Sequence, residues 1–125
     1  MKALAVSVLA VALLAGCGGG SSTAQPAGSI KVSMTEWKFD PGTDTSITAP
    51  AGRVVFYVVN ASSNTSHDMI IRNNAGTRVA GSDLISAGDT SVFTVTNIAA
   101  GTYTIFCDQP GHESSGMKGT LTITG

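Results

Sequence analysis

The sequence predicts an all-β fold, a β-sandwich or barrel of seven to eight short strands. From Ser29 onward, apolar residues recur at every second position, and no stretch shows a sustained helical period. Val, Ile, Thr, Ser and Gly dominate the composition, whereas charged residues make up only 12% of the chain, which favours strands joined by turns. Turn residues interrupt the alternation at intervals of roughly ten residues, the spacing that is typical of sandwiches and barrels.

The strands follow from this alternation in chain order. The first begins at Ile30, and its pattern continues through Trp37 and Phe39. The stretch 53–60 is apolar on both faces, as expected for a central strand. The stretch 79–85 is weakly patterned and is compatible with a short helical turn. The other expected strands are 45–48, 67–72, 90–96, 102–107 and 118–124.

Several residues in these strands are expected to have structural roles. Tyr103 follows Gly101-Thr102, where a tyrosine corner ties down a connection between sheets through its hydroxyl. Phe106 precedes a cysteine at the end of the same strand and is expected to pack rather than to carry electrons. Met34 and Met69 lie in two of the expected strands and are expected in the core.

The N-terminus is a targeting segment. Residues 1–16 combine a positive start with an apolar run that is too short to span a bilayer comfortably. The segment ends in Leu14-Ala15-Gly16-Cys17, which resembles a bacterial lipobox and implies cleavage before Cys17 and lipidation of that residue. The alternative is an ordinary signal peptide cut near Gly16. Residues 17–28 are expected to form a lipidated, flexible tether, and residues 29–125 the folded domain.

This interpretation predicts an exported protein, anchored by lipid to a bacterial membrane on its periplasmic or extracellular face. The length of 125 residues suits one domain, which we expect to be a monomer. The formal net charge is −1 and there is no basic patch, so nucleic acid is not an expected partner. A disulfide between Cys17 and Cys107, the only two cysteines, is the alternative to separate roles for them.

The clearest chemical signal is the spacing Cys107-x4-His112-x4-Met117 in one loop. Two imidazoles and a thiolate in a near-trigonal plane, with a weak axial thioether, are the ligands of blue copper sites. The second imidazole must come from His67, the only other histidine in the chain. Thiolate suits Cu(I), imidazole suits both oxidation states, and a weak thioether favours reduction. The four residues therefore predict one type 1 copper per chain.

Taken singly, each of these residues would be an ordinary buried thiol, histidine or methionine. The combined spacing makes the metal site the better interpretation. The loop lies between two expected strands, at one end of the sandwich, and His67 reaches the same end if the strands run antiparallel. Asp68, Asp108 and Glu113 lie beside the ligands, where they either solvate the surface or shape a docking face.

Residues 29–125 resemble the small cupredoxins of the plastocyanin, azurin and auracyanin type. The matching residues are 54–60, His67, 101–103, Cys107, 110–112 and 116–121. The resemblance implies a Greek-key β-sandwich with one type 1 copper that carries electrons. The His-to-Met spacing is one residue longer than in azurin, and the Cys-to-His spacing is two longer than in plastocyanin. Asp68 stands where many cupredoxins have Asn, a position whose backbone N–H donates to the cysteine sulfur.

The predicted function is therefore a membrane-tethered one-electron carrier that cycles between Cu(II) and Cu(I). Redox partners are expected to dock near His112, whose ring edge would emerge through a rim of Pro110, Gly111 and Gly116. A copper-binding module for tolerance, storage or delivery is the alternative, although the chain has no Met- or His-rich tail. Copper enzymes need more than two histidines, so the protein is not expected to be an enzyme. A thioether ligand is uncharacteristic of zinc.

Overall fold

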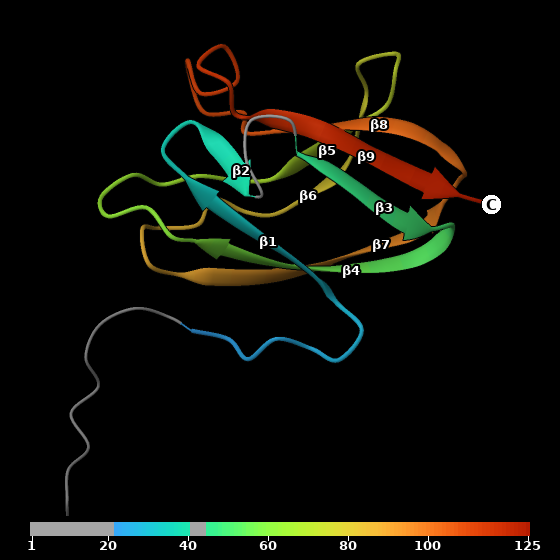
Figure 1. The fold of residues 1–125 in the computed structure, drawn as a ribbon, viewed down its shortest axis with the longest axis horizontal. Helices are drawn as coiled ribbons and strands as arrows, with labels where there is room; N and C mark the ends of the chain where they lie inside the picture. The colour runs from blue at the N-terminus through green and yellow to red at the C-terminus, as the bar shows by residue number, and fades with distance from the viewer. Residues whose placement is uncertain (1–21, 41–44) are drawn as a thin grey trace, which may run out of the picture.

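The computed structural model describes residues 22–40 and 45–125, which form two β-sheets packed face to face (Figure 1). One sheet has the strand order β2-β1-β4-β7, and the other has the order β3-β9-β8-β5-β6. The strands are β1 (Ile30–Thr35), β2 (Lys38–Asp40), β3 (Ser46–Pro50), β4 (Gly52–Asn60), β5 (Ile70–Arg72), β6 (Arg78–Gly81), β7 (Thr90–Ile98), β8 (Gly101–Phe106) and β9 (Lys118–Thr124). The predicted all-β sandwich is confirmed.

The chain passes repeatedly from one sheet to the other, so neighbours within a sheet are often distant in sequence. β1 pairs with β4 and β3 pairs with β9 in parallel, whereas the other pairs are antiparallel. The inward faces of the two sheets supply an apolar core. Its fully buried members include Val32, Met34, Phe39, Phe56, Val58, Met69, Ile71, Ile105 and Leu121. Met34 and Met69 lie in the core, as the sequence predicts.

The described residues contain nine strands rather than seven or eight, because two expected elements are wrong. The alternation through Trp37 and Phe39 predicts one continuous strand, but the chain turns at Glu36 and Trp37. β2 then returns antiparallel to β1, with Thr35 opposite Lys38. Met34 and Trp37 are three positions apart instead of two, and this break in the alternation marks the turn, which contains neither Gly nor Pro.

The second error concerns the weakly patterned stretch 79–85, whose first three residues belong to the edge strand β6 instead of a helical turn. β6 pairs with β5 only, and Val79 is 40% exposed on it. An edge strand with an exposed face does not need strict alternation. His67 also lies outside a regular strand: it forms an isolated bridge with Ile85, and β5 begins at Ile70.

The other expectations for single elements agree with the structure. β4 lies between β1 and β7, and its inward residues Val54, Phe56 and Val58 are buried. The Tyr103 hydroxyl donates a hydrogen bond to the carbonyl oxygen of Ala99 (2.9 Å), which ties the turn before β8 to that strand as a tyrosine corner does. Within the described part of the chain, no helix is long and apolar enough to cross a membrane.

Three segments come together at one end of the sandwich, away from the C-terminus (Figure 1). They are the ligand loop (residues 107–117, between β8 and β9), the segment 61–69 between β4 and β5, and the turn between β1 and β2. Each is anchored by strands of the core, so the fold brings residues that are distant in sequence to one place.

Candidate metal centre

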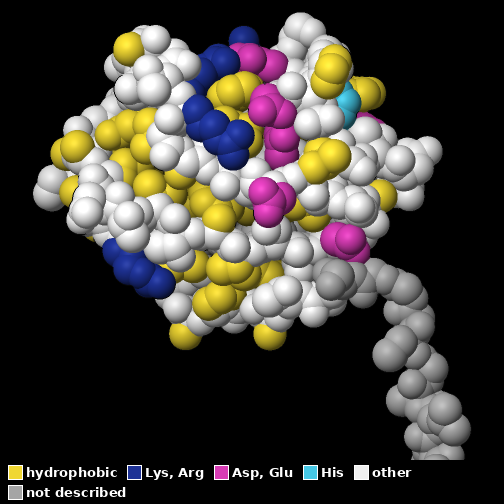
Figure 2. All heavy atoms as spheres, turned by 180° about the vertical axis from the view of Figure 1, so that it is seen from behind, with side chains coloured by type: hydrophobic (Ala, Val, Ile, Leu, Met, Phe, Trp, Pro, Cys, Tyr) yellow, Lys and Arg dark blue, Asp and Glu magenta, His cyan; other side chains and the backbone are white. Residues whose placement is uncertain are grey.

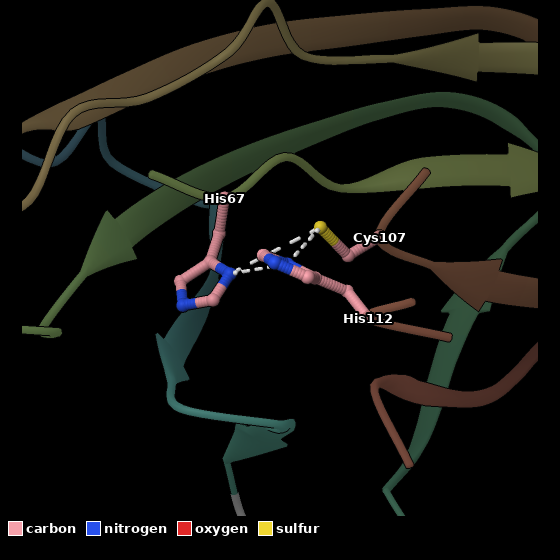
Figure 3. A group of neighbouring side chains, drawn as sticks. All are labelled: His67, Cys107 and His112. Atoms are coloured by element: carbon pink, nitrogen blue, oxygen red, sulfur yellow. Dashed lines mark hydrogen bonds between the residues drawn. The ribbon is translucent and has the colours of Figure 1, made fainter. Parts of the chain in front are cut away.

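Three potential donor atoms converge at this end of the sandwich: Nδ1 of His67, Sγ of Cys107 and Nδ1 of His112 (Figure 3). The two nitrogen atoms are 3.1 Å apart, and Sγ lies 3.4 Å from His112 Nδ1 and 4.0 Å from His67 Nδ1. Within the described ranges, no other group of three His, Cys, Asp or Glu side chains is close enough to share a metal ion. The structure thus brings together three of the four predicted ligands.

The separations of these donors fit one metal ion. A triangle with these sides has its centre about 2.1 Å from each corner, which is close to a metal–nitrogen bond and slightly short of a metal–sulfur bond. Cys107 and His67 are fully buried, and His112 is half-buried. Two imidazoles and one thiolate around a common point are the equatorial donors of a type 1 copper site.

Met117, the fourth predicted ligand, is fully buried at the end of the ligand loop. The Cys107 N–H donates to the Met117 carbonyl oxygen (3.1 Å), and the Met117 N–H donates to the His112 carbonyl oxygen (3.1 Å). Three residues with thiolate, imidazole and thioether groups are thus tied together through their own backbones. The Met117 thioether is therefore buried in the loop that carries Cys107 and His112, and a thioether is the axial donor that type 1 copper uses.

The ligand loop is a chain of hydrogen-bonded turns. The N–H of His112 donates to Gln109, that of Ser115 to Gly111, and that of Gly116 to Glu113, at 3.0–3.1 Å. Gly111 (φ 81°) and Gly116 (φ 114°) adopt backbone conformations that other residues rarely adopt. The long spacing between the predicted ligands is therefore compatible with an ordered loop.

Comparison with known proteins identifies the family. Residues 4–123 match the family model of the cupredoxin-like domain. The chain belongs to the cupredoxin-like family.

Individual relatives agree with this result. A stretch of 41 residues is 46% identical to auracyanin-B of Chloroflexus aurantiacus, but it covers 33% of this chain and only 17% of that protein. The fold is similar to that of reduced auracyanin from Roseiflexus castenholzii, with a TM-score of 0.68, 23% identity and coverage of 81% of this chain and 100% of that one. It is also similar to auracyanin A of Chloroflexus aurantiacus, described as a blue copper protein (TM-score 0.65, 24% identity, 85% and 100% coverage).

Asp68 anchors the ligand loop of this cupredoxin to the segment that carries His67. Its carboxylate accepts hydrogen bonds from the Asp108 N–H (2.9 Å) and from Gln109 Nε2 (3.2 Å). The backbone N–H groups of Asp68 and Gln109 donate to the Cys107 sulfur. The expected N–H donor at position 68 is present. The Asp68 carboxylate joins the two loops through its hydrogen bonds to Asp108 and Gln109. A further hydrogen bond between the side chains of Asp68 and Asp108 raises the pKa of Asp108.

A second anchor joins the ligand loop to β5. The Glu113 carboxylate forms an ion pair with the Arg72 guanidinium, with one N–O distance of 3.1 Å, and Arg72 lies 4.2 Å above the centre of the Phe106 ring. The hydrogen bond from Arg72 lowers the pKa of Glu113. Glu113 is therefore paired with Arg72 within the protein.

A buried serine holds His67 from the side opposite the donors. Ser62 Oγ lies 2.8 Å from His67 Nε2, and the Ser62 N–H donates to Asn60 Oδ1 (3.0 Å). Asn60 Nδ2 donates to the carbonyl oxygens of Thr65 and Ile85 (both 2.8 Å), which fixes the segment around the histidine. With Nδ1 as the metal-facing atom, Nε2 carries the proton and donates to Ser62, an arrangement that orients metal-binding histidines.

Burial shifts the pKa values of two of the donors, Cys107 and His67. Burial raises the pKa of the Cys107 thiol to about 11, although the two backbone N–H donors act in the opposite direction. Burial and the neighbouring His112 lower the pKa of His67, so its ring is neutral at pH 7. A metal ion binds thiolate and neutral imidazole, so binding releases a proton from Cys107 and becomes stronger as the pH rises.

Sequence reasoning missed two residues at this site, Ser62 and Trp37. The segment 61–66 is polar, a pattern that indicates only a loop, yet Ser62 is 5% exposed and contacts His67. The alternation places Trp37 in a strand, yet its ring lies edge-on to both histidines, 4.8 Å from His112 and 6.4 Å from His67 between ring centres. Neither residue has a local pattern that indicates its contact, since both contacts depend on the folding of distant segments.

We expect Ser62→Ala to weaken copper binding by about tenfold, because the variant leaves a buried imidazole N–H without an acceptor and frees the ring to rotate. Competition with a chelator of known affinity, at fixed pH, measures the change.

Ser82→Ala is the matched control. Ser82 is buried to the same degree as Ser62 (4% and 5% exposed), but its hydroxyl accepts the Met69 N–H at 3.0 Å instead of contacting a histidine ring. This variant should lower the thermal stability and leave copper affinity unchanged. Equal copper affinity in Ser62→Ala and the wild type would contradict the role given to Ser62.

Proposed function

We propose that this chain is a one-electron carrier that holds one type 1 copper through His67, Cys107, His112 and Met117. The observation that carries the proposal is the convergence of two imidazole nitrogens and one thiol sulfur, all within 4.0 Å of one another, with a buried methionine in the same loop as two of them. Membership of the cupredoxin-like family supports the same conclusion. Copper in such a site cycles between Cu(II) and Cu(I).

The residues around the donors favour electron transfer because they restrict movement. Asp68 and the Arg72–Glu113 ion pair hold the ligand loop, and Ser62 holds His67. Donors that are held in one arrangement change position little between the Cu(II) and Cu(I) states, so the reorganisation energy of electron transfer is small. The same restriction argues against a copper-delivery role, in which ligands must exchange easily. We assign no catalytic residue and propose that the protein is not an enzyme.

Electrons would enter and leave through the half-buried His112. His67 is fully buried, so of the two histidines only His112 reaches the surface. Figure 2 shows a histidine side chain at the surface among hydrophobic side chains. A small, mainly apolar face suits the weak and brief encounters of redox proteins. We propose that a redox protein docks here and that the carrier acts as a monomer.

The location proposed for the carrier rests on the sequence of the N-terminus. Cys17 and most of the segment around it lie outside the described residues. We propose residues 1–16 as a signal peptide, residues 17–28 as a tether that begins with lipidated Cys17, and residues 29–125 as the carrier domain. The lipid would hold the domain at the outer face of a bacterial membrane, in the periplasm or at the cell surface.

The visible spectrum tests the proposed copper site directly. The wild type with one equivalent of Cu(II) should absorb strongly in the visible range through charge transfer from the Cys107 thiolate to copper. Cys107→Ser should abolish this band, because an alkoxide or alcohol does not replace the soft thiolate. A colourless Cu(II)-loaded wild type, or a coloured Cys107→Ser variant, would exclude type 1 copper.

Met117→Leu tests the axial ligand. The loss of a weak donor to Cu(II) should raise the reduction potential while the colour persists. A tenfold loss in relative Cu(II) affinity corresponds to about 59 mV for one electron, and voltammetry resolves such a shift. Met34→Leu, at a fully buried core position in β1, is the matched control and should leave the potential unchanged. An unchanged potential in Met117→Leu would show that Met117 is not a ligand.

Cys17→Ala tests the anchor. The Cys17→Ala variant should be absent from the membrane fraction and should keep the visible band. Cys107→Ser should remain in the membrane fraction and lose the band. Cell fractionation combined with mass spectrometry of the mature N-terminus measures both properties. A mature N-terminus other than acylated Cys17 would rule out the lipid anchor and leave the copper site unaffected.

A further inference from the structure

Trp37 has an unusual position for a large aromatic residue. It is the only tryptophan in the chain, it is 44% exposed, and its backbone φ is +66°. A bulky side chain rarely adopts this left-handed conformation, which is unfavourable for every residue except Gly and a few small polar ones. Such a conformation persists where surrounding contacts compensate for it, and it is often found at functional sites.

The contacts that compensate are with the candidate metal ligands. The indole ring lies 4.8 Å from the ring centre of His112 at an interplanar angle of 80°, and 6.4 Å from that of His67 at 83°. Both are edge-to-face arrangements, the geometry that aromatic rings prefer. A single side chain thus contacts both imidazoles from one side, while Ser62 holds His67 from another.

The backbone of the β1–β2 turn also packs on the ligand loop. A Cβ atom added to Gly116 would lie 3.3 Å from the Trp37 carbonyl oxygen, so the loop passes close to the turn at the residue before Met117. The turn itself is held in place, because Thr35 pairs with Lys38 and the Met34 carbonyl oxygen accepts the Ala61 N–H at 2.8 Å. The position of the indole is therefore set by the frame of the sandwich.

We propose that Trp37 is a positioning residue of the metal centre, a cap that holds the His112 and His67 rings in their metal-binding orientation and screens the metal from water. The inference rests on the proposed copper site and adds a residue to it. A ring held against His112 limits rotation of the one histidine that reaches the surface. It also replaces water beside the metal with an apolar surface, which disfavours the more highly charged Cu(II) state.

Trp37→Gly separates this role from a role in the turn alone. Gly adopts a φ of +66° without strain. If Trp37 only formed the turn, its replacement by Gly should therefore change neither copper retention nor the reduction potential. We expect the metal-free Trp37→Gly variant to unfold at the same temperature as the wild type or higher. Its copper should be lost to a chelator at least tenfold faster. Its reduction potential should also fall, by about 59 mV for each tenfold gain in the affinity for Cu(II) relative to Cu(I).

Trp37→Phe should restore most of the retention and potential, because it keeps an aromatic ring at the same position. Val92→Thr is the control for the loss of exposed apolar surface, since Val92 is 36% exposed on β7 and should affect neither property. The fluorescence of Trp37 gives an independent measurement in the wild type, because Trp37 is the only tryptophan in the chain. This fluorescence should change with the first equivalent of copper and not with further additions.

The outcomes distinguish this inference from the proposed function. Normal copper retention and potential in Trp37→Gly, in a protein that shows the thiolate band, would overturn the cap and leave the copper site intact. Equal defects in Trp37→Gly and Trp37→Phe would also overturn it, because the aromatic ring would then not be the cause. Absence of the band in the wild type would overturn the copper site and the cap together.

Discussion

The antiparallel pairing of β8 with β9 fixes both ends of the ligand loop, and the arrangement of the metal centre depends on it. Phe106 and Lys118 are the last partners in this ladder, and the hydrogen bond from the Cys107 N–H to the Met117 carbonyl oxygen extends it by one step. The backbones of Cys107 and Met117, which are ten positions apart in sequence, are thereby held side by side. His112 then needs to be positioned only within a closed loop, by short-range turns.

The remaining donor, His67, comes from a different part of the chain, so the loop must also be fixed relative to β5. Asp68 does this beside Cys107, and the Arg72–Glu113 pair does it beside His112. A surface ion pair contributes little stability by itself, commonly below about 1 kcal/mol. Its value here is geometric, because it limits where a long loop carrying three candidate ligands can move.

Burial has two consequences at the centre. It excludes water from Cys107 and His67, and it keeps the thiol protonated and the imidazole neutral until a metal binds. The half-exposed His112 and the exposed Trp37 then form the only described contact between the donors and the surface. A centre that is closed except at one histidine edge suits electron transfer, in which electrons cross the boundary and the metal does not.

The sequence by itself determined the class of fold and the chemistry of the site. Alternation of apolar residues with a period of two indicates a strand that is buried on one face. The spacing Cys-x4-His-x4-Met indicates that three potential metal donors lie in one loop. Both patterns are local in sequence. Only the tertiary structure decided that Trp37 turns onto the histidines, that Ser62 is buried beneath His67, and that Glu113 is paired with Arg72. These contacts join residues 5 to 75 positions apart, and they depend on strand register and on how loops meet at the end of the sandwich, which no local pattern encodes.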